Sequence, residues 1–160
     1  MTNESTELAA DRAQYITFRA SDQDFAADIM SIREIRGWSS TTPIPHVAEY
    51  VRGIINLRGK VLPVIDLKAR LGGGLTEVSP STVIVVVDTR EHTVGVLVDA
   101  VVDILAVSRD QVQGVPEIVG DASNDYVEGI AVIDDKMVTL LDMQRLTASQ
   151  DSIGGSTQEQ

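Results

Sequence analysis

An internal repeat constrains this chain more than any other feature. Residues 50–67, YVRGIINLRGKVLPVIDL, align without a gap on residues 126–143, YVEGIAVIDDKMVTLLDM, at an offset of 76. Tyr, Val, Gly, Ile, Lys and Asp recur at matching positions, and most of the other positions are apolar in both copies. A weaker echo at an offset of 69 matches apolar residues between 25–35 and 94–104. Such self-similarity means that one supersecondary unit is used twice.

Each copy of the long repeat is typical of a β-hairpin that leads into a short helix. In the first copy, apolar runs flank Arg58-Gly59, and Gly59 can supply the positive φ that a tight turn needs. Asp66 is a good N-cap and Gly72 a good helix stop. Pro63 cannot donate a hydrogen bond to a ladder, so we expect its strand to be an edge strand or to be bulged there.

The rest of the chain favours β structure. Its apolar residues, 43% of the total, are mostly Val, Ile and Leu, and the branched side chains among them suit a pleated surface. Each half contains about five strand-like segments separated by turn signals, which is typical of small barrels that close to hide their edges. We therefore predict an all-β fold of two small barrels.

The repeat also suggests how the chain is divided. We expect one folded domain over residues 14–146, with the first barrel mainly in 21–80, the second mainly in 81–146, and some strand exchange between them. Residues 1–13 are polar and acidic, and 147–160 are polar and of low complexity, so both are expected to be flexible tails. The N-terminus lacks the pattern of a signal peptide, and no apolar run approaches the ~20 residues of a membrane span.

Charge and composition weigh against several functions. The net charge of −11 opposes binding to nucleic acid or to an anionic membrane. The chain has no Cys, its two histidines, His46 and His92, are far apart, and no catalytic triad spacing is present. We expect no catalytic residue, metal site or cofactor, although an enzyme or a nucleic-acid-binding barrel stays an alternative hypothesis. The Asp134-Asp135 pair is better explained as a turn than as a metal site.

Two residues have both a functional and a structural explanation. Arg58 could anchor a partner through its planar guanidinium, or it could be an ordinary turn cation. In either case its charge must meet water, an internal acid such as Glu34, or a partner. Trp38, the only tryptophan, could be an interface anchor or could pack over the loop that contains Pro43 and Pro45.

Four segments together resemble the CheW family, the chemotaxis adaptors that couple chemoreceptors to the histidine kinase CheA. They are EIRGW at 34–38, the first hairpin at 50–67, VGVLVDAVVDIL at 94–105 and the second hairpin at 126–142. The resemblance covers about residues 14–146. It implies two five-stranded SH3-like β-barrels packed around a shared core, with short helices. It also implies a non-enzymatic cytoplasmic scaffold, recruited to receptor arrays at the inner face of the membrane.

The resemblance implies two contact sites, one for the cytoplasmic hairpin tips of receptors and one for the regulatory domain of CheA. Gly53 and Gly129 are also explained as bends of the barrels. A related adaptor module such as CheV, or an adaptor of a non-flagellar chemosensory pathway, is the alternative within the family. The receptor contacts would map to a groove between the barrels, at Ile35, Gly53, Asn56, Arg58, Gly59, Val101 and Val102. The kinase contacts would map to the second barrel, at Gly95, Val96, Leu97 and Gly129.

Overall fold

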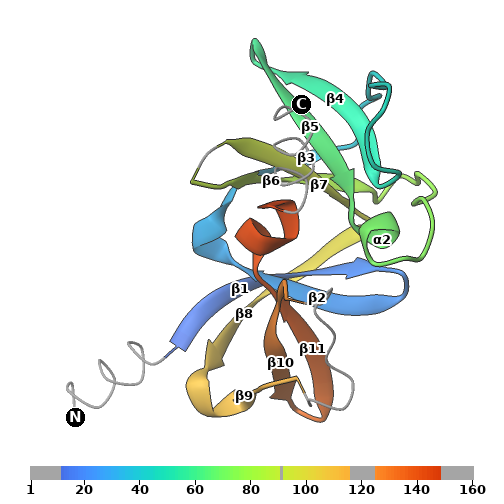
Figure 1. Ribbon diagram of the computed structural model, residues 1–160. Coiled ribbons are helices and arrows are strands. Elements are labelled where there is room, and N and C mark those ends of the chain that lie inside the picture. Colours follow the sequence, from blue (N-terminus) through green and yellow to red (C-terminus); the bar gives the residue numbers. More distant parts are fainter. Residues whose placement is uncertain (1–11, 91, 116–124, 149–160) are drawn as a thin grey trace.

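The structure is a computed structural model that describes residues 12–90, 92–115 and 125–148 (Figure 1). It consists of two mixed β-sheets with short helical turns, which confirms the all-β fold. One sheet contains β1 (Arg12–Ala20), β2 (Gln23–Asp28), β8 (Ala100–Ser108), β9 (Val112–Gln113), β10 (Val127–Ile133) and β11 (Lys136–Leu141). The other contains β3 (Ile32–Gly37), β4 (Val51–Leu57), β5 (Lys60–Asp66), β6 (Val83–Asp88) and β7 (Thr93–Val98). The helical turns are η1 (Ile29–Ser31), α2 (Leu67–Arg70), η2 (Arg109–Gln111) and residues 143–148.

The two sheets repeat the same strand order. It is β3-β6-β7-β5-β4 in the five-stranded sheet and β8-β1-β2-β11-β10-β9 in the six-stranded sheet. The registers also match: Gly53 faces Val64 on β5, and Gly129, 76 residues later, faces Leu140 on β11. Both hairpins have a bulge at that glycine. The offset of 69 relates β3 to β8 and β7 to β2. Both sequence echoes therefore correspond to strands in equivalent positions of the two sheets.

The division of the chain between the sheets differs from the limits of 21–80 and 81–146. The five-stranded sheet takes one continuous stretch, 32–98, because β6 pairs with β3 and β7 pairs with β5. The six-stranded sheet takes the strands on either side of that stretch. Each half of the chain, β1–β5 and β6–β11, therefore gives strands to both sheets, whereas each copy of the long repeat stays within one sheet. The chain crosses between the sheets twice, at η1 and at Asp99.

Several local expectations need correction. The second sheet has six strands, and among the described residues no backbone ladder joins the outer strands of either sheet into a closed barrel. The N-terminal tail is shorter than expected, since β1 begins at Arg12. Thr147, expected in the C-terminal tail, is buried in a helical turn. Residues 1–11 and 149–160 lie outside the described residues.

The strand that contains Pro63 is not an edge strand. β5 lies between β4 and β7, but its parallel ladder with β7 begins only at Val64. Proline is tolerated because it precedes that ladder. The short helix after this strand forms as expected. Asp66 accepts a hydrogen bond from the N–H of Ala69, and Gly72 follows with a φ of 89°.

Three hydrophobic clusters hold the sheets. One lies under each sheet, and the third, which includes Phe18, Leu67, Val85 and Met143, draws residues from both. This third cluster is the shared core implied by the resemblance. It places the two hairpins, β4–β5 and β10–β11, towards opposite ends of the molecule (Figure 1).

Candidate functional site: the two hairpin ends

The first hairpin ends in a two-residue turn at Arg58 and Gly59. Their φ angles are 52° and 87°, which are those of a type I′ turn. The side chain of Asn56 accepts a hydrogen bond from the Gly59 N–H at 2.7 Å. The second hairpin uses the same turn at Asp134 and Asp135, with φ angles of 50° and 69°. The repeat thus keeps the backbone of the turn and changes its charge.

Arg58 forms a two-pronged ion pair with Glu34 on β3. Its Nη2 lies 2.5 Å from Oε1 and its Nη1 lies 3.4 Å from Oε2. Because the Arg58 guanidinium hydrogen-bonds to the carboxylate, the pKa of Glu34 is lowered and that of Arg58 is raised. β3 and β4 are the outer strands of the five-stranded sheet, so this side-chain bridge joins edges that the backbone leaves apart.

The surface beside this ion pair is basic with apolar patches. Ile35 is 38% exposed and Val61 is 60% exposed. Arg33 is also exposed on β3, and Asn56 and Gly59 are exposed at the tip. Of the expected receptor contacts, Ile35, Asn56, Arg58 and Gly59 therefore offer accessible groups at one end of the five-stranded sheet.

Gly53 and Trp38 have structural roles in this sheet. Gly53 is buried with a φ of 140°, and an added Cβ would lie 2.3 Å from the carbonyl oxygen of Thr42. Its place in the hairpin is explained by that close backbone approach. Trp38 packs against the core of the five-stranded sheet, and the guanidinium of Arg52 lies 5.5 Å from its ring centroid. Packing therefore accounts for Trp38.

The residues expected to contact the kinase are buried. Val96 and Leu97 have no exposed surface, and Gly95 lies beside them on β7. A Cβ at Gly129 would come within 2.8 Å of the Gln113 carbonyl oxygen. These side chains cannot touch a partner, so any effect of changing them on binding would act through the fold. The uninterrupted apolar run on β7 is the signal of a strand buried on both faces.

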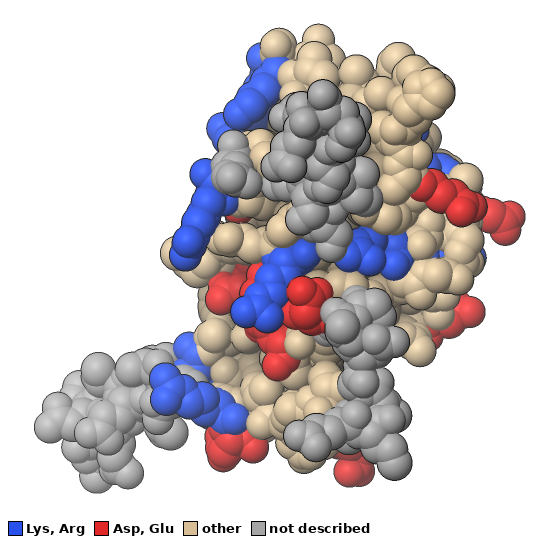
Figure 2. Space-filling view, viewed as in Figure 1, with Lys and Arg blue, Asp and Glu red and all other residues tan. Residues whose placement is uncertain are grey.

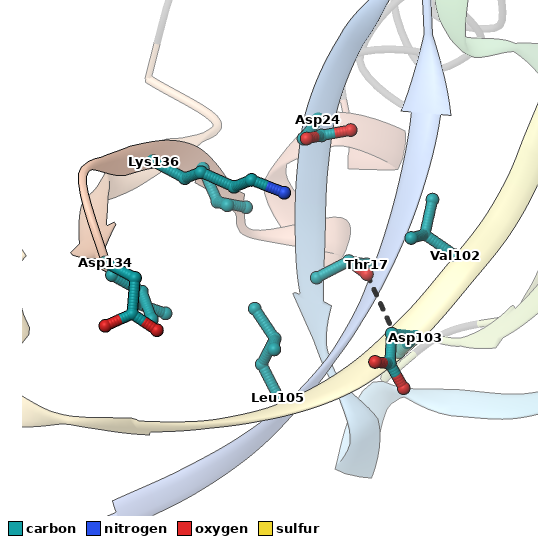
Figure 3. Close-up of a pocket in the computed structure, with 9 residues that line it drawn as sticks. Thr17, Asp24, Val102, Asp103, Leu105, Asp134 and Lys136 are labelled. Carbon is teal, nitrogen blue, oxygen red and sulfur yellow. Dashed lines mark hydrogen bonds between the residues drawn. The ribbon is translucent and has the colours of Figure 1, made fainter.

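The second hairpin end has a cavity where the first end has its ion pair. The cavity has a volume of about 260 Å³ and lies in the six-stranded sheet (Figure 3). Val102, expected among the receptor contacts, lies here, and Val101 is on the same strand. The sequence reasoning missed this cavity. Its lining residues are Thr17, Asp24, Val102, Asp103, Leu105, Ile133, Asp134, Lys136 and Val138.

The two cores differ in side-chain size near the cavity. The offset of 76 sets Ala131 where the first core has Ile55, and Val138 where it has Leu62. The offset of 69 sets Thr17 where the first core has Val86, a side chain of nearly the same shape. Leu140, in place of Val64, changes in the opposite sense. Of the three replacements Ala131, Val138 and Thr17, Val138 is the one that lines the cavity and is clearly smaller than its equivalent.

Charge also differs near the junction of the sheets. In the first copy, the Arg52 Nε lies 3.8 Å from the buried carboxylate of Asp66. The equivalent residues of the second copy are Glu128 and Asp142, two acids. Partial burial and the charges of Asp142 and Asp28 raise the pKa of Glu128, although the hydrogen bond from Tyr15 and the charge of Arg145 act in the opposite direction. The two copies therefore differ in stabilising charge as well as in shape.

The space-filling view shows how charge is spread over one face (Figure 2). Basic side chains follow one edge of the five-stranded half, and acidic side chains appear in the middle, at the right edge and at the lower end, with basic side chains also in the middle and at the lower left. The two histidines stay apart: His46 is exposed in a loop, and His92 lies in the turn between β6 and β7. In the part of the chain that the structure describes, we find no helix able to cross a membrane.

Comparisons with known proteins agree with this architecture. The sequence profile of the CheW-like domain matches residues 14–151. The chain is 42% identical over 151 residues to chemotaxis protein CheW of Rhizobium meliloti (strain 1021), covering 94% of this chain and 97% of that protein. It is 45% identical over 139 residues to a probable chemotaxis protein CheW of Rhizobium etli, covering 87% of this chain and 90% of that protein.

A solved structure has the same fold. The crystal structure of the scaffolding protein TtCheW from Thermoanaerobacter tengcongensis superposes with a TM-score of 0.77 at 34% identity, and the match covers 84% of this chain and 92% of that one. The duplicated sheets, the shared core, the profile match across nearly all the described residues and the identity to these relatives lead to one conclusion: the chain belongs to the CheW-like domain family.

Proposed function

We propose that this protein is a non-enzymatic chemotaxis adaptor that couples chemoreceptors to the histidine kinase CheA. The observation that carries the proposal is the extent of the family match, which includes both hairpins and both sheets. Relatives of similar length are named chemotaxis proteins, and one solved relative is named a scaffolding protein. An adaptor of this kind works in the cytoplasm, at receptor arrays on the inner face of the membrane.

The receptor contact in this proposal is the exposed end of the five-stranded sheet. Arg58 is oriented by Glu34, so the guanidinium is held in one place before a partner arrives. A fixed, planar donor loses less entropy on binding than a mobile one. Ile35 on β3 and Val61 on β5 add exposed apolar area to these strands. The cytoplasmic hairpin tip of a receptor would bind through hydrogen bonds to Arg58 and Asn56 and through these apolar side chains.

The kinase contact in this proposal moves from β7 to the exposed surface of the six-stranded sheet. β7 offers no accessible side chain, whereas Val102, Ile104 and Met137 are more than half exposed. Exposed apolar side chains are the ones that a protein partner can bury. We therefore assign Val101 and Val102 to the kinase surface, so that the two partners bind at opposite ends of the adaptor.

A charge reversal tests the receptor contact. We expect Arg58→Glu to weaken co-sedimentation with receptor-containing membranes and to lower kinase activation, because the reversed charge breaks the Glu34 pair and repels partner carboxylates. Folding is expected to survive, since the Arg58 side chain is 65% exposed. Arg109→Glu, on an exposed residue of η2 in the other sheet, is the matched control. If Arg58→Glu couples the receptor to the kinase as well as the wild type does, the receptor contact does not lie at this end of the sheet.

A further inference from the structure

The two hairpin ends share a backbone and keep an acid and a lysine at matching positions, but they differ in chemistry at three others. Arg33, Arg36 and Arg58 of the first end correspond, through the offsets of 69 and 76, to Val102, Leu105 and Asp134 of the second. Glu34 corresponds to Asp103. The first end therefore contains a matched ion pair among arginines. The second contains three acids, Asp24, Asp103 and Asp134, and one lysine, Lys136, around a cavity with an apolar wall.

The cavity combines an apolar wall with an acidic rim. Leu105, Ile133 and Val138 are packed on the core of the six-stranded sheet and line the cavity. Figure 3 shows Asp103 and Asp134 on opposite sides of it, with Leu105 between them in this view. The Asp103 Oδ1 accepts the Ile104 N–H at 2.7 Å, which orients that carboxylate at the rim.

The acidic rim already contains one cation of the chain. In Figure 3 the amino end of Lys136 points across the cavity towards Asp24. Asp103 and Asp134, on opposite sides of the cavity in the same view, are both exposed. Among the residues that the structure describes, no group of three or more carboxylates or imidazoles is arranged to hold a metal ion.

The first end shows what completes such a site. There the Arg58 guanidinium meets Glu34, with donor–acceptor distances of 2.5 and 3.4 Å, and closes the gap between the outer strands. At the second end the residue at the position of Arg58 is Asp134, so the chain brings a second carboxylate in place of the guanidinium. A cation brought from outside would restore the pairing, and its aliphatic stem would cover the apolar wall.

We propose that this cavity receives an Arg or Lys side chain of the kinase, with the stem against Leu105 and Val138 and the charged head between Asp103 and Asp134. The proposal rests on the adaptor function and names the chemistry of its kinase contact. An arginine suits the site best, because its planar fork can reach two carboxylates at once.

The test measures binding of purified CheA to the full-length protein by titration calorimetry. Asp134→Arg installs in the second hairpin the residue that the first one has, so it should pair with Asp103 and exclude the partner's cation. We expect roughly a tenfold or greater loss of affinity. Asp135→Arg is the matched control: it makes the same charge change in the same turn, at a residue that does not line the cavity. It should bind nearly as wild type.

Two further variants separate volume from charge. Val138→Leu puts the first core's larger residue into the wall, so it should fill part of the cavity and weaken binding without any change in charge. Asp134→Asn should weaken binding and reduce its dependence on salt, since one screened charge pair is lost. Circular dichroism spectra and melting temperatures of all variants confirm that each is folded before its affinity is compared.

The outcomes distinguish the two levels of the proposal. If the wild type does not bind CheA, the adaptor function itself is wrong. If the wild type binds and both Asp134→Arg and Val138→Leu bind equally well, the cation site is wrong while the adaptor function stands. If sedimentation shows that the protein self-associates and that Asp134→Arg abolishes this, the occupant is a second copy and the assignment to the kinase is overturned.

Discussion

Single residues decide how the two copies of one backbone differ. At the hairpin tip the same turn contains Arg58 in one copy and Asp134 in the other, and near the junction the chain has Arg52 in one copy and Glu128 in the other. The acids that pair with these arginines are Glu34 and Asp66. Their equivalents, Asp103 and Asp142, are also acids. In the first copy, the two acids are therefore neutralised by arginines of the same copy. In the second copy, the acids are neutralised by protonation, by Lys136 and Arg145, or by a partner.

Gly53 gives a prediction that depends on backbone geometry alone. Gly53→Ala places a Cβ 2.3 Å from a backbone oxygen at a φ of 140°, so we expect a loss of roughly 1–3 kcal/mol or more in the free energy of unfolding. Gly129→Ala, without a positive φ, should cost less. Gly37→Ala meets no atom within 4 Å and is the control. Urea denaturation checks the order, and equal losses at Gly53 and Gly37 would contradict it.

Glu128 predicts how stability changes with pH. Its pKa is raised in the folded protein, so the charged form is disfavoured there, and the resulting penalty is present above the folded pKa. The penalty disappears as the pH falls through that pKa towards the unfolded value. Glu128→Gln should therefore raise the melting temperature at pH 7.5 and lose this advantage as the pH approaches 4.5.

The control for this variant is Glu77→Gln, which removes one exposed charge from the segment between α2 and β6. It should change the melting temperature similarly at both pH values, since its carboxyl group is not among those facing Glu128. An advantage of Glu128→Gln that is independent of pH would show that burial and repulsion of the ionised Glu128 carboxylate do not control the effect.

At the residue scale, the sequence predicted the turn at Arg58, because a turn is a local feature, and it named Glu34 as one of three possible counterparts of the Arg58 charge, beside water and a partner. It did not predict that Val96 and Leu97 are inaccessible, because a resemblance transfers positions without their burial. The cavity at the second end was also missed. The contrast between Val102 and Arg33, visible at the offset of 69, could have indicated it.

Among the elements, the two short helices that follow the hairpins start in the same way and are held differently. Asp66 and Asp142 each accept a backbone N–H three residues later. Asp66 is fully buried and also binds the N–H and hydroxyl of Thr76, at 2.8 and 2.7 Å. Asp142 stays partly exposed and pairs with Arg145 at 3.7 Å. Asp66 thus also fixes the segment that contains Thr76, whereas Asp142 caps only its helix.

This contrast predicts unequal costs for the same substitution. Asp66→Ala removes the partner of Arg52 and Thr76 inside the protein, so we expect a loss of roughly 3–5 kcal/mol. Asp142→Ala removes a cap and should cost about 1 kcal/mol, offset in part by relief of the repulsion with Glu128. Guanidinium unfolding of the two variants measures both losses. Similar losses would mean that the buried network around Asp66 adds no stability.

The sequence predicted most elements because turns, caps and strand runs are local signals. The strand order was harder. Pro63 suggested an edge strand, yet β5 is internal, since a proline only has to precede the neighbouring ladder and the length of that ladder is not encoded locally. The predicted tails were too long by one or two residues at each end. Arg12 pairs with Ser108 and Thr147 is buried, and both depend on segments that are distant in the sequence.

For the whole molecule, each half of the chain contributes strands to both sheets, so neither half contains a complete sheet. The repeat revealed two equivalent sheets, but it did not reveal which strands share a sheet, because hydrogen bonding between distant segments has no local signature. The five-stranded sheet is accordingly a continuous insertion between β2 and β8. The third core, with residues from both sheets, joins them.

This arrangement predicts a single cooperative unfolding transition. Leu140→Ala opens a space in the core of the six-stranded sheet, at a cost of roughly 2–5 kcal/mol. Trp38 reports on the five-stranded sheet, where it packs. We expect the midpoint from Trp38 fluorescence to fall together with the midpoint from far-UV circular dichroism. A tryptophan signal that keeps its wild-type midpoint would show that the sheets unfold independently.

The two crossings have a mechanical consequence. Tension between partners bound at opposite ends would run through the backbone at η1 and at Asp99, in addition to the packed surface between the sheets. Both links are short and fastened: Asp28 accepts the Met30 N–H at 2.8 Å, and the Asp99 N–H donates to the Arg19 carbonyl at 2.9 Å. An adaptor loaded from both sides would therefore stretch very little, and a displacement imposed on one sheet would reach the other almost undiminished.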